Sequence, residues 1–243
     1  LNEESRSSFD LFLKEQCEMR QCKCPFPNRL TVFDYYVDLS NYSWVIWSDG
    51  ITNMNFTMKN PIYQQMIPTN ENASTFYLSK LLISYGKNMM ICGPETSKTL
   101  MASILMNDTL DPAVYDTHNL PISSCTTPST LKSFMISFMH KHSGQFGPLP
   151  NQHLVFFFDN INTIQPEMYG AQPSLELLRQ FHDYQGWYNT KTMEFLNITG
   201  TSIYNIMGQP GGGLYNVPDR LLRHYFYLYI PKYKSSSIQQ IMQ

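Results

Sequence analysis

One continuous run of apolar residues limits the fold of this chain more than any other stretch. Residues 154–158 read LVFFF, and Asp159 and Asn160 follow at once. An apolar run that is rich in β-branched and aromatic residues and lacks alternation is typical of a strand buried on both faces of a parallel sheet. Open α/β sheets bind their ligands at the carboxyl ends of such strands. The run therefore predicts a largely parallel α/β fold in which Asp159 is presented to a ligand.

The segments around this run alternate between strand-like and helix-like patterns, which is typical of the α/β class. Leu175, Leu178 and Phe181 recur at helical spacing and predict a helix over 174–184. The other expected segments are a short helix within 1–28, a hairpin over 30–47, a helix over 74–86, strands over 88–92, near 120–123, over 199–207 and over 224–230, helices that carry Leu100 and Leu131, and a loop over 143–151.

Length and charge exclude several classes of function. A chain of 243 residues can form one large α/β domain with an appendage. A net charge of −2 and a pI near 6.3 argue against nucleic acid as a partner. No apolar run approaches the roughly 20 residues that a membrane-spanning helix needs. The spacing of Cys17, Cys22 and Cys24 does not fit a zinc site, so we expect reduced thiols and a cytoplasmic chain.

A loop of small residues between an expected strand and an expected helix indicates a phosphate site. In a P-loop, G-x-x-x-x-G-K-[ST], backbone amides cradle the phosphates, the lysine reaches the β- and γ-phosphates, and the hydroxyl binds Mg²⁺. Here Lys98 and Thr99 stand at the lysine and hydroxyl positions, and Asp159 follows as the expected metal-binding acid. The candidate loop consists of Gly93, Pro94, Glu95, Thr96, Ser97, Lys98, Thr99 and Leu100.

This loop departs from a working P-loop in ways that weaken it. It is one residue short, Ser97 replaces the glycine before the lysine, and Glu95 adds a negative charge. Asn160 stands where an active site has a second acidic residue, and an amide cannot act as a general base. Loss of a positioned base commonly removes about 10²–10⁴-fold in rate. We therefore expect ATP or ADP with Mg²⁺ to bind weakly or not at all, with slow or absent hydrolysis.

Longer motifs carry a more specific signal. In order they are TVFDYYVD (31–38), WVIW (44–47), MIPT (66–69), VFFFDNIN (155–162), YGAQPSLELLRQF (169–181), GWY (186–188), MGQPGGG (207–213) and RLLRH (220–224). With this set the chain resembles the axonemal dynein heavy chains, in the region of the third AAA+ module of the motor ring. The resemblance covers nearly the whole chain and is strongest in its last third.

The resemblance implies a fold and a division of the chain. It implies a P-loop NTPase of the AAA+ type, a three-layer αβα sandwich around a largely parallel sheet. Residues 1–50 would be a linker from the preceding module, with a short helix and a β-hairpin. Residues 51–243 would be the AAA+ large subdomain with a degenerate nucleotide site. Because the chain ends soon after Ile230, most of the small helical lid is expected to be missing.

The resemblance also implies roles for single residues. Lys98 and Thr99 match the phosphate and metal ligands, Asp159 matches the metal-binding Walker B acid, and Asn160 occupies the position of the catalytic acid. No residue is therefore assigned as catalytic. Gly208 lies near the sensor-1 position, where active sites place a polar side chain.

A second group of positions concerns the module's edge and its sensor. Asn205 is close to the sensor-1 position, in a register that the sequence leaves open. Arg220 and Arg223 match a basic pair that would face the neighbouring module's nucleotide as arginine fingers; the alternative is an ordinary salt bridge. Leu214 replaces a family arginine.

These matches imply a module of a microtubule motor in a structural or regulatory role. The parent family is an ATPase, but this module is expected to be deficient in hydrolysis. The alternatives are a competent ATPase with an unusual P-loop and a scaffold that binds no nucleotide. The implied partners are neighbouring AAA+ modules of the same heavy chain and, through the parent protein, intermediate chains, light chains and microtubules, in the cytoskeleton of the ciliary axoneme. Neither nucleic acid nor membrane is expected.

Overall fold

The structure is a computed structural model of the whole chain. It describes residues 3–22, 26–27, 29–38, 41–47, 49, 61, 66–67, 69–94, 97–142, 144–189 and 192–242. Contacts between residues divide the chain into two compact units, Leu1–Ser74 with Ser235–Gln243, and Thr75–Lys234. The division expected at residue 50 stays a prediction.

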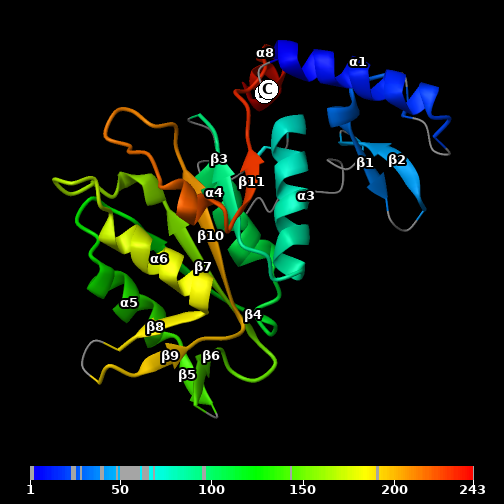
Figure 1. Cartoon of the computed structure of the whole chain (residues 1–243). Helices are drawn as coiled ribbons and strands as arrows, with labels where there is room; N and C mark the ends of the chain where they lie inside the picture. The colour runs from blue at the N-terminus through cyan, green and yellow to red at the C-terminus, as the bar shows by residue number, and fades with distance from the viewer. Residues whose placement is uncertain are drawn as a thin grey trace. The chain divides into compact units, whose positions relative to one another are not determined.

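A five-stranded parallel sheet forms the centre of the larger unit (Figure 1). Its strand order is β11-β3-β10-β7-β4, which is 5-1-4-3-2 when the five strands are numbered along the chain. Every neighbouring pair in this sheet is parallel. The predicted α/β class with a parallel sheet is therefore confirmed. The strands are β3 (Met89–Cys92), β4 (Tyr115–Pro121), β7 (His153–Asp159), β10 (Thr201–Met207) and β11 (Phe226–Tyr229).

Strand β7 is buried on both faces, as its continuous apolar run predicts. Its alternate residues Leu154, Phe156 and Phe158 are at most 1% exposed and join one apolar cluster with helices on that face. Val155 and Phe157 point to the other face and are equally buried. Because β10 and β4 flank this strand, both of its hydrogen-bonding edges are also paired.

Helices cover both faces of the sheet. The chain first moves across the sheet from β3 to the edge strand β4, and a right-handed crossover in that direction places α4 on one face. It then returns through β7 and β10 to β11, and right-handed crossovers in this opposite direction place α5, α6 and α7 on the other face. Leu131 of α5 and Leu175, Leu178 and Phe181 of α6 pack in the same cluster as Phe156. The helices of this unit are α3 (Asn70–Ser84, which begins in the smaller unit), α4 (Lys98–Ile104), continued by a π turn (Leu105–Thr109), α5 (Pro128–Ser137), the 3-10 turn η4 (Ile161–Thr163), α6 (Pro173–Tyr184) and α7 (Asp219–Leu222).

Two β-hairpins are inserted between the helices and strands. The first pairs β5 (His140–His142) with β6 (Gln145–Gly147), and the second pairs β8 (Gly186–Tyr188) with β9 (Phe195–Asn197). A bridge between Phe146 and Ile198 joins the hairpins. The predicted loop over 143–151 was therefore wrong in part. Its ordered pairing depends on this contact with a segment about 50 residues away, which a local pattern does not reveal.

The strand expected near 120–123 also differs from the structure. Strand β4 begins at Tyr115, because its polar residues pair with β7 along the edge of the sheet. An edge strand has one neighbour and keeps half-exposed side chains, so the criterion of a continuous apolar run misses it.

The smaller unit contains α1 (Glu3–Met19), the 3-10 turn η1 (Val32–Asp34), the antiparallel hairpin β1 (Tyr35–Asp38) with β2 (Ser43–Ile46), and α8 (Ser235–Met242). The hairpin confirms the prediction for 30–47. Asp10 joins α1 to the next segment, because it accepts a hydrogen bond from Val32 N at 2.7 Å and pairs with Lys14 at 2.9 Å.

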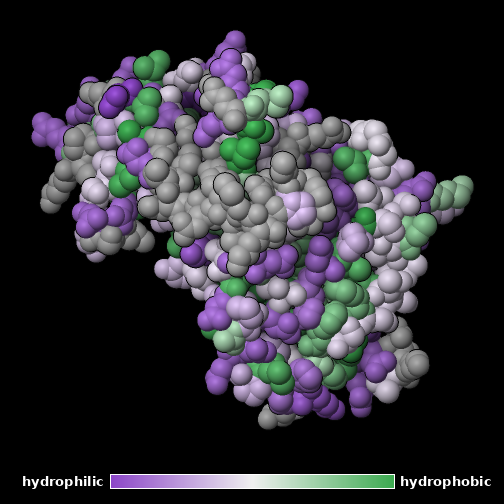
Figure 2. Space-filling view, turned by 180° about the vertical axis from the view of Figure 1, so that it is seen from behind, coloured by the Kyte–Doolittle hydropathy of each residue, from purple (hydrophilic) through white to green (hydrophobic). Residues whose placement is uncertain are grey.

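Among the described helices, none combines the length and the apolar character that a membrane span requires. Figure 2 shows hydrophobic residues interspersed with hydrophilic ones over the face seen from behind. Such a mixture is ordinary for a folded chain, since much of any protein surface is apolar.

Cys17, Cys22, Cys92 and Cys125 are free thiols, while Cys24 lies outside the described residues.

Candidate nucleotide site

The candidate site lies at the carboxyl edge of the parallel sheet. The phosphate loop follows β3, and Asp159 ends β7, two strands away across β10. In open α/β sheets this edge is where ligands bind. The structure thus brings Lys98, Thr99 and Asp159 to the same edge of the sheet.

Asp159 is a buried carboxylate with capacity to bind a further ligand. It is 8% exposed, and its Oδ1 has no hydrogen-bond partner within the described part of the chain. Burial raises the pKa of this carboxyl group, while a hydrogen bond from the Thr99 side chain, a backbone hydrogen bond at Asn160 and the Lys98 charge act to lower it. A buried oxygen without a partner is costly, and a cation would satisfy it.

Lys98 is turned toward its own loop. The side chain is 6% exposed, and its ammonium donates hydrogen bonds to the carbonyl oxygens of Gly93, at 3.1 Å, and of Pro94. These carbonyls occupy donor capacity that a phosphate would require. The lysine is therefore at the P-loop position but in a conformation that closes the loop on itself.

Ser97 does not act as the cap of the following helix. Its side chain makes no capping hydrogen bond to α4. Instead, its Oγ lies 2.6 Å from Oη of Tyr233, which follows strand β11.

Glycine is required at position 93 because the backbone of Ile230 packs closely against it. Its φ is +152°, and a Cβ built there would lie 2.3 Å from the carbonyl oxygen of Ile230. That is far inside van der Waals contact, so only glycine fits without a shift of backbone. Glu95 and Thr96, also predicted to line the site, lie outside the described residues. Leu100 lies in the first turn of α4 and is half-buried.

Asn160 adopts a left-handed backbone conformation, which short side chains such as asparagine and aspartate tolerate better than longer ones. Its φ and ψ are 56° and 49°, in the left-handed helical region, and its side chain is exposed. Asparagine is enriched in this region, whereas a longer side chain pays a steric cost there. The carbonyl of Asn160 accepts hydrogen bonds from Thr163 N and Oγ1, at 3.0 and 2.9 Å, which fix the turn. The residue therefore stabilises the end of β7 and supplies no base.

Asn205 points away from the candidate site. In the sheet it is in register with Phe158 and with Met90, so its side chain lies on their face, opposite to that of Asp159. It is fully buried, and neither of its amide atoms has a hydrogen-bond partner within the described part of the chain. Its proximity to the sensor-1 position in the sequence therefore does not place it beside the phosphate loop.

Asn162 is a structural residue whose role the local sequence does not reveal. Its Nδ2 donates to the Gly208 carbonyl at 3.0 Å, and its Oδ1 accepts from Gly208 N at 3.4 Å. These two bonds tie the segment after β10 to the segment after β7. A Cβ at Gly208 would lie 2.6 Å from Cδ1 of Leu214, so the glycine allows the following loop to fold back. The local signal was only the second asparagine of the DNIN motif.

Arg220 and Arg223 lie on the helical layer opposite the phosphate loop. Arg220 pairs with Glu176 at 2.7 Å, and Arg223 pairs with Asp183 at 2.6 Å, although both arginine side chains remain about 60% exposed. Arg179 contacts the same two acids. Within this chain the pair therefore forms surface salt bridges with α6. Its role toward a neighbouring module stays a prediction.

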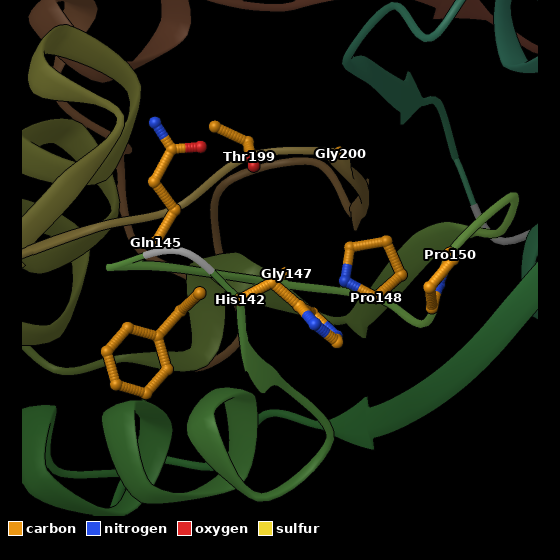
Figure 3. Close-up of a pocket in the computed structure, with 8 residues that line it drawn as sticks. His142, Gln145, Gly147, Pro148, Pro150, Thr199 and Gly200 are labelled. Carbon is orange, nitrogen blue, oxygen red and sulfur yellow. The ribbon is translucent and has the colours of Figure 1, made fainter.

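A separate pocket lies at the opposite edge of the sheet. It is lined by the β5–β6 hairpin and the loop after it, and by Thr199 and Gly200 (Figure 3). Gly200 directly precedes β10, and Pro150 lies just before β7, so this pocket is at the amino ends of those strands. It is not part of the site formed by Lys98 and Asp159.

Comparisons with known proteins agree on one family. The family model described as "P-loop containing dynein motor region" matches residues 54–233, and the one described as "Dynein heavy chain AAA lid domain" matches residues 1–49. Dynein axonemal heavy chain 1 of Homo sapiens is 33% identical over 244 residues, covering 92% of this chain and 6% of that protein.

Two further relatives also match over most of this chain. Dynein axonemal heavy chain 12 of Homo sapiens is 32% identical over 207 residues, covering 84% of this chain and 7% of that protein. Dynein axonemal heavy chain 6 of Homo sapiens is 26% identical over 245 residues, covering 100% of this chain and 6% of that protein. The chain thus spans only 6–7% of the length of these curated relatives.

Proposed function

The chain belongs to the dynein heavy chain family, and we propose that it supplies the third AAA+ module of the motor ring, with a site that binds ATP or ADP weakly and does not hydrolyse it. The observation that carries this proposal is the arrangement at the carboxyl edge of the sheet. Lys98, Thr99 and Asp159 are retained there, while Asn160 replaces the base. Binding groups without a base support a regulatory or structural role.

The residues present fit a nucleotide with Mg²⁺. Mg²⁺ prefers oxygen ligands, and the Asp159 carboxylate and the Thr99 hydroxyl are such ligands, close enough that Thr99 acts to lower the pKa of Asp159. The unpartnered Oδ1 of Asp159 provides the capacity. When bound, the metal would neutralise charge on the phosphates. Lys98 would supply the remaining positive charge after releasing the carbonyls of Gly93 and Pro94.

Weak binding follows from the state of the loop. Before it can contact phosphate, Lys98 must exchange two carbonyl partners for the anion. Binding that first requires an unfavourable rearrangement is weakened by the fraction of chains in the competent state. Asn160 cannot take a proton from water, and its exposed side chain lies on a left-handed turn. Both features favour occupancy without turnover.

The proposed setting is the cytoskeleton of the axoneme. The relatives are named as axonemal dynein heavy chains, so we propose that this chain acts beside other AAA+ modules of one heavy chain. Contacts with microtubules, intermediate chains and light chains would be made by the parent protein. Arg220 and Arg223, exposed on the layer opposite the phosphate loop, are the candidates for contact with a neighbouring module's nucleotide.

A nucleotide-free scaffold is the second candidate function. The observation in its favour is that Lys98 is already bonded to Gly93 and Pro94, so the loop is closed by the chain's own atoms. In that case the α/β unit would serve only to pack against its neighbours. The two candidates differ in whether phosphate can displace those carbonyls.

Titration with a fluorescent ATP analogue and Mg²⁺ distinguishes the two functions. We expect saturable binding that Lys98→Ala weakens at least tenfold, since a hydrogen bond to a charged group contributes about 1.5–3 kcal/mol. Lys132→Ala is the matched control, because Lys132 also donates to a backbone carbonyl, that of Tyr188, outside the phosphate loop. Equal binding by both variants would end the case for a nucleotide site at the loop and favour the scaffold.

A further inference from the structure

A tyrosine after the last strand of the sheet is hydrogen-bonded to the phosphate loop. Oη of Tyr233 lies 2.6 Å from Oγ of Ser97, although 136 residues separate them in the chain. Ser97 is the residue that departs from the P-loop pattern. A glycine at this position would have no hydroxyl, so the bond exists only because of the departure.

The segment that carries Tyr233 runs closely over the start of the loop. Ile230 N donates to the Cys92 carbonyl at 2.9 Å, which extends the pairing of β11 with β3. The Ile230 carbonyl then lies where a side chain on Gly93 would be. Residues 230–233 are therefore held against both ends of the loop, at Gly93 by backbone contact and at Ser97 by the tyrosine hydroxyl.

The same loop holds Lys98 in its inward conformation. The lysine directly follows Ser97, so the position of the Ser97 side chain restricts the first turn of α4 and the lysine with it. Met101 N donates to the Ser97 carbonyl at 2.8 Å, which fixes the backbone of Ser97 from the other side. A loop anchored at Ser97 in this way resists the movement that would turn Lys98 from Gly93 and Pro94 toward an anion.

We propose that Tyr233 is an internal latch on the phosphate loop: its hydroxyl, bonded to Ser97, holds Ser97 and Lys98 in the conformation in which Lys98 is bonded to Gly93 and Pro94, and this bond must break before the phosphates of a nucleoside di- or triphosphate can enter. The inference rests on the proposed function, because it assumes that the opened loop binds nucleotide. Nucleotide and the Tyr233–Ser97 bond then exclude one another. Any contact that draws Tyr233 away would raise the affinity of the site.

The size of the effect follows from the strength of one hydrogen bond. A net intramolecular hydrogen bond changes an equilibrium by about 2- to 10-fold. Tyr233→Phe keeps the ring and removes only the hydroxyl, and Ser97→Ala removes the partner. Each should tighten binding of the ATP analogue by that factor. The double variant should bind no more tightly than the better single variant, because both changes remove the same bond.

The experiment uses the whole chain and two readouts. The first is the dissociation constant of the ATP analogue for wild type, the two single variants and the double variant, with Tyr229→Phe as the control. That control removes an exposed tyrosine hydroxyl from β11, four residues earlier. The second readout is hydrogen exchange, without nucleotide, at the backbone amides of Ser97, Lys98 and Thr99, which should be faster in Tyr233→Phe and unchanged in Tyr229→Phe.

The outcomes separate the latch from the proposed function. Tighter binding and faster exchange in Tyr233→Phe support the latch. Binding that depends on Lys98 but is unchanged or weaker in Tyr233→Phe overturns the latch and leaves the proposed function standing. If no variant binds nucleotide, the proposed function fails, and exchange still decides whether Tyr233 restrains the loop. Unchanged exchange in Tyr233→Phe overturns the latch in every case.

Discussion

Gly93 gives the sharpest test of how the phosphate loop is packed. Its φ of +152° is rarely adopted by L side chains, and an added Cβ would lie 2.3 Å from the Ile230 carbonyl oxygen. This oxygen belongs to a backbone segment tied to Cys92, so it cannot rotate aside as a flexible side chain can. Gly93→Ala therefore combines backbone strain, about 1–3 kcal/mol, with overpacking that typically costs another 1–3 kcal/mol or so.

We expect Gly93→Ala to lower the free energy of unfolding by about 3 kcal/mol. The measurement is urea denaturation followed by far-UV circular dichroism. Gly170→Ala is the matched control: its φ is +78°, but nothing lies within 4 Å of the added Cβ. It should cost only the backbone term, about 1 kcal/mol. A Gly93→Ala variant as stable as Gly170→Ala would refute the close packing of Ile230 on the loop and weaken the latch with it.

Three further predictions concern buried side chains. Burial raises the pKa of Asp159 above its unfolded value, so the native state loses stability as the pH rises from the unfolded pKa to the folded pKa. Asp159→Asn should therefore raise the urea midpoint at pH 7, with the gain fading toward pH 3, while Mg²⁺-dependent nucleotide binding falls. Burial lowers the pKa of His182 to about 3. The free energy of unfolding should therefore fall as the pH drops from about 6.5 toward 3, by up to about 1.4 kcal/mol per pH unit. A His182→Gln variant that keeps this slope would contradict the assignment of the slope to His182. Leu178→Ala, at a fully buried position of α6, should lower the free energy of unfolding by about 3 kcal/mol. Leu149→Ala, at a half-exposed position, should lower it by less than about 0.5 kcal/mol.

The central strand and its carboxylate could be predicted because their burial leaves a local trace. A strand covered on both faces and paired on both edges has apolar residues at every position, and Leu154–Phe158 show this directly. The end of that run predicted the position of Asp159. The helix over 174–184 was predictable for the same reason, since Leu175, Leu178 and Phe181 recur at the spacing of one buried face.

Other parts depend on contacts between distant segments and leave no such trace. The bond from Ser97 to Tyr233, the pairing of Arg220 with Glu176 and the ties from Asn162 to Gly208 each join segments more than 40 residues apart. The orientation of Asn205 depends on strand register, and a shift of one residue would have turned it toward Asp159. The polar edge strand β4 and the β5–β6 hairpin also depend on pairing with distant segments, so the boundaries predicted for them were wrong in part.

Phosphate release from ATP by the whole chain tests whether the site at Lys98 and Asp159 holds nucleotide without hydrolysing it. We expect ATP bound with Mg²⁺ to stay intact, with turnover below about 0.1 s⁻¹, since typical enzymes reach about 10 s⁻¹ and loss of the base removes at least about 10²-fold. Lys98→Ala run in parallel identifies any contaminating activity. Sustained release above about 1 s⁻¹ that disappears in Lys98→Ala would contradict a site that holds nucleotide without hydrolysing it.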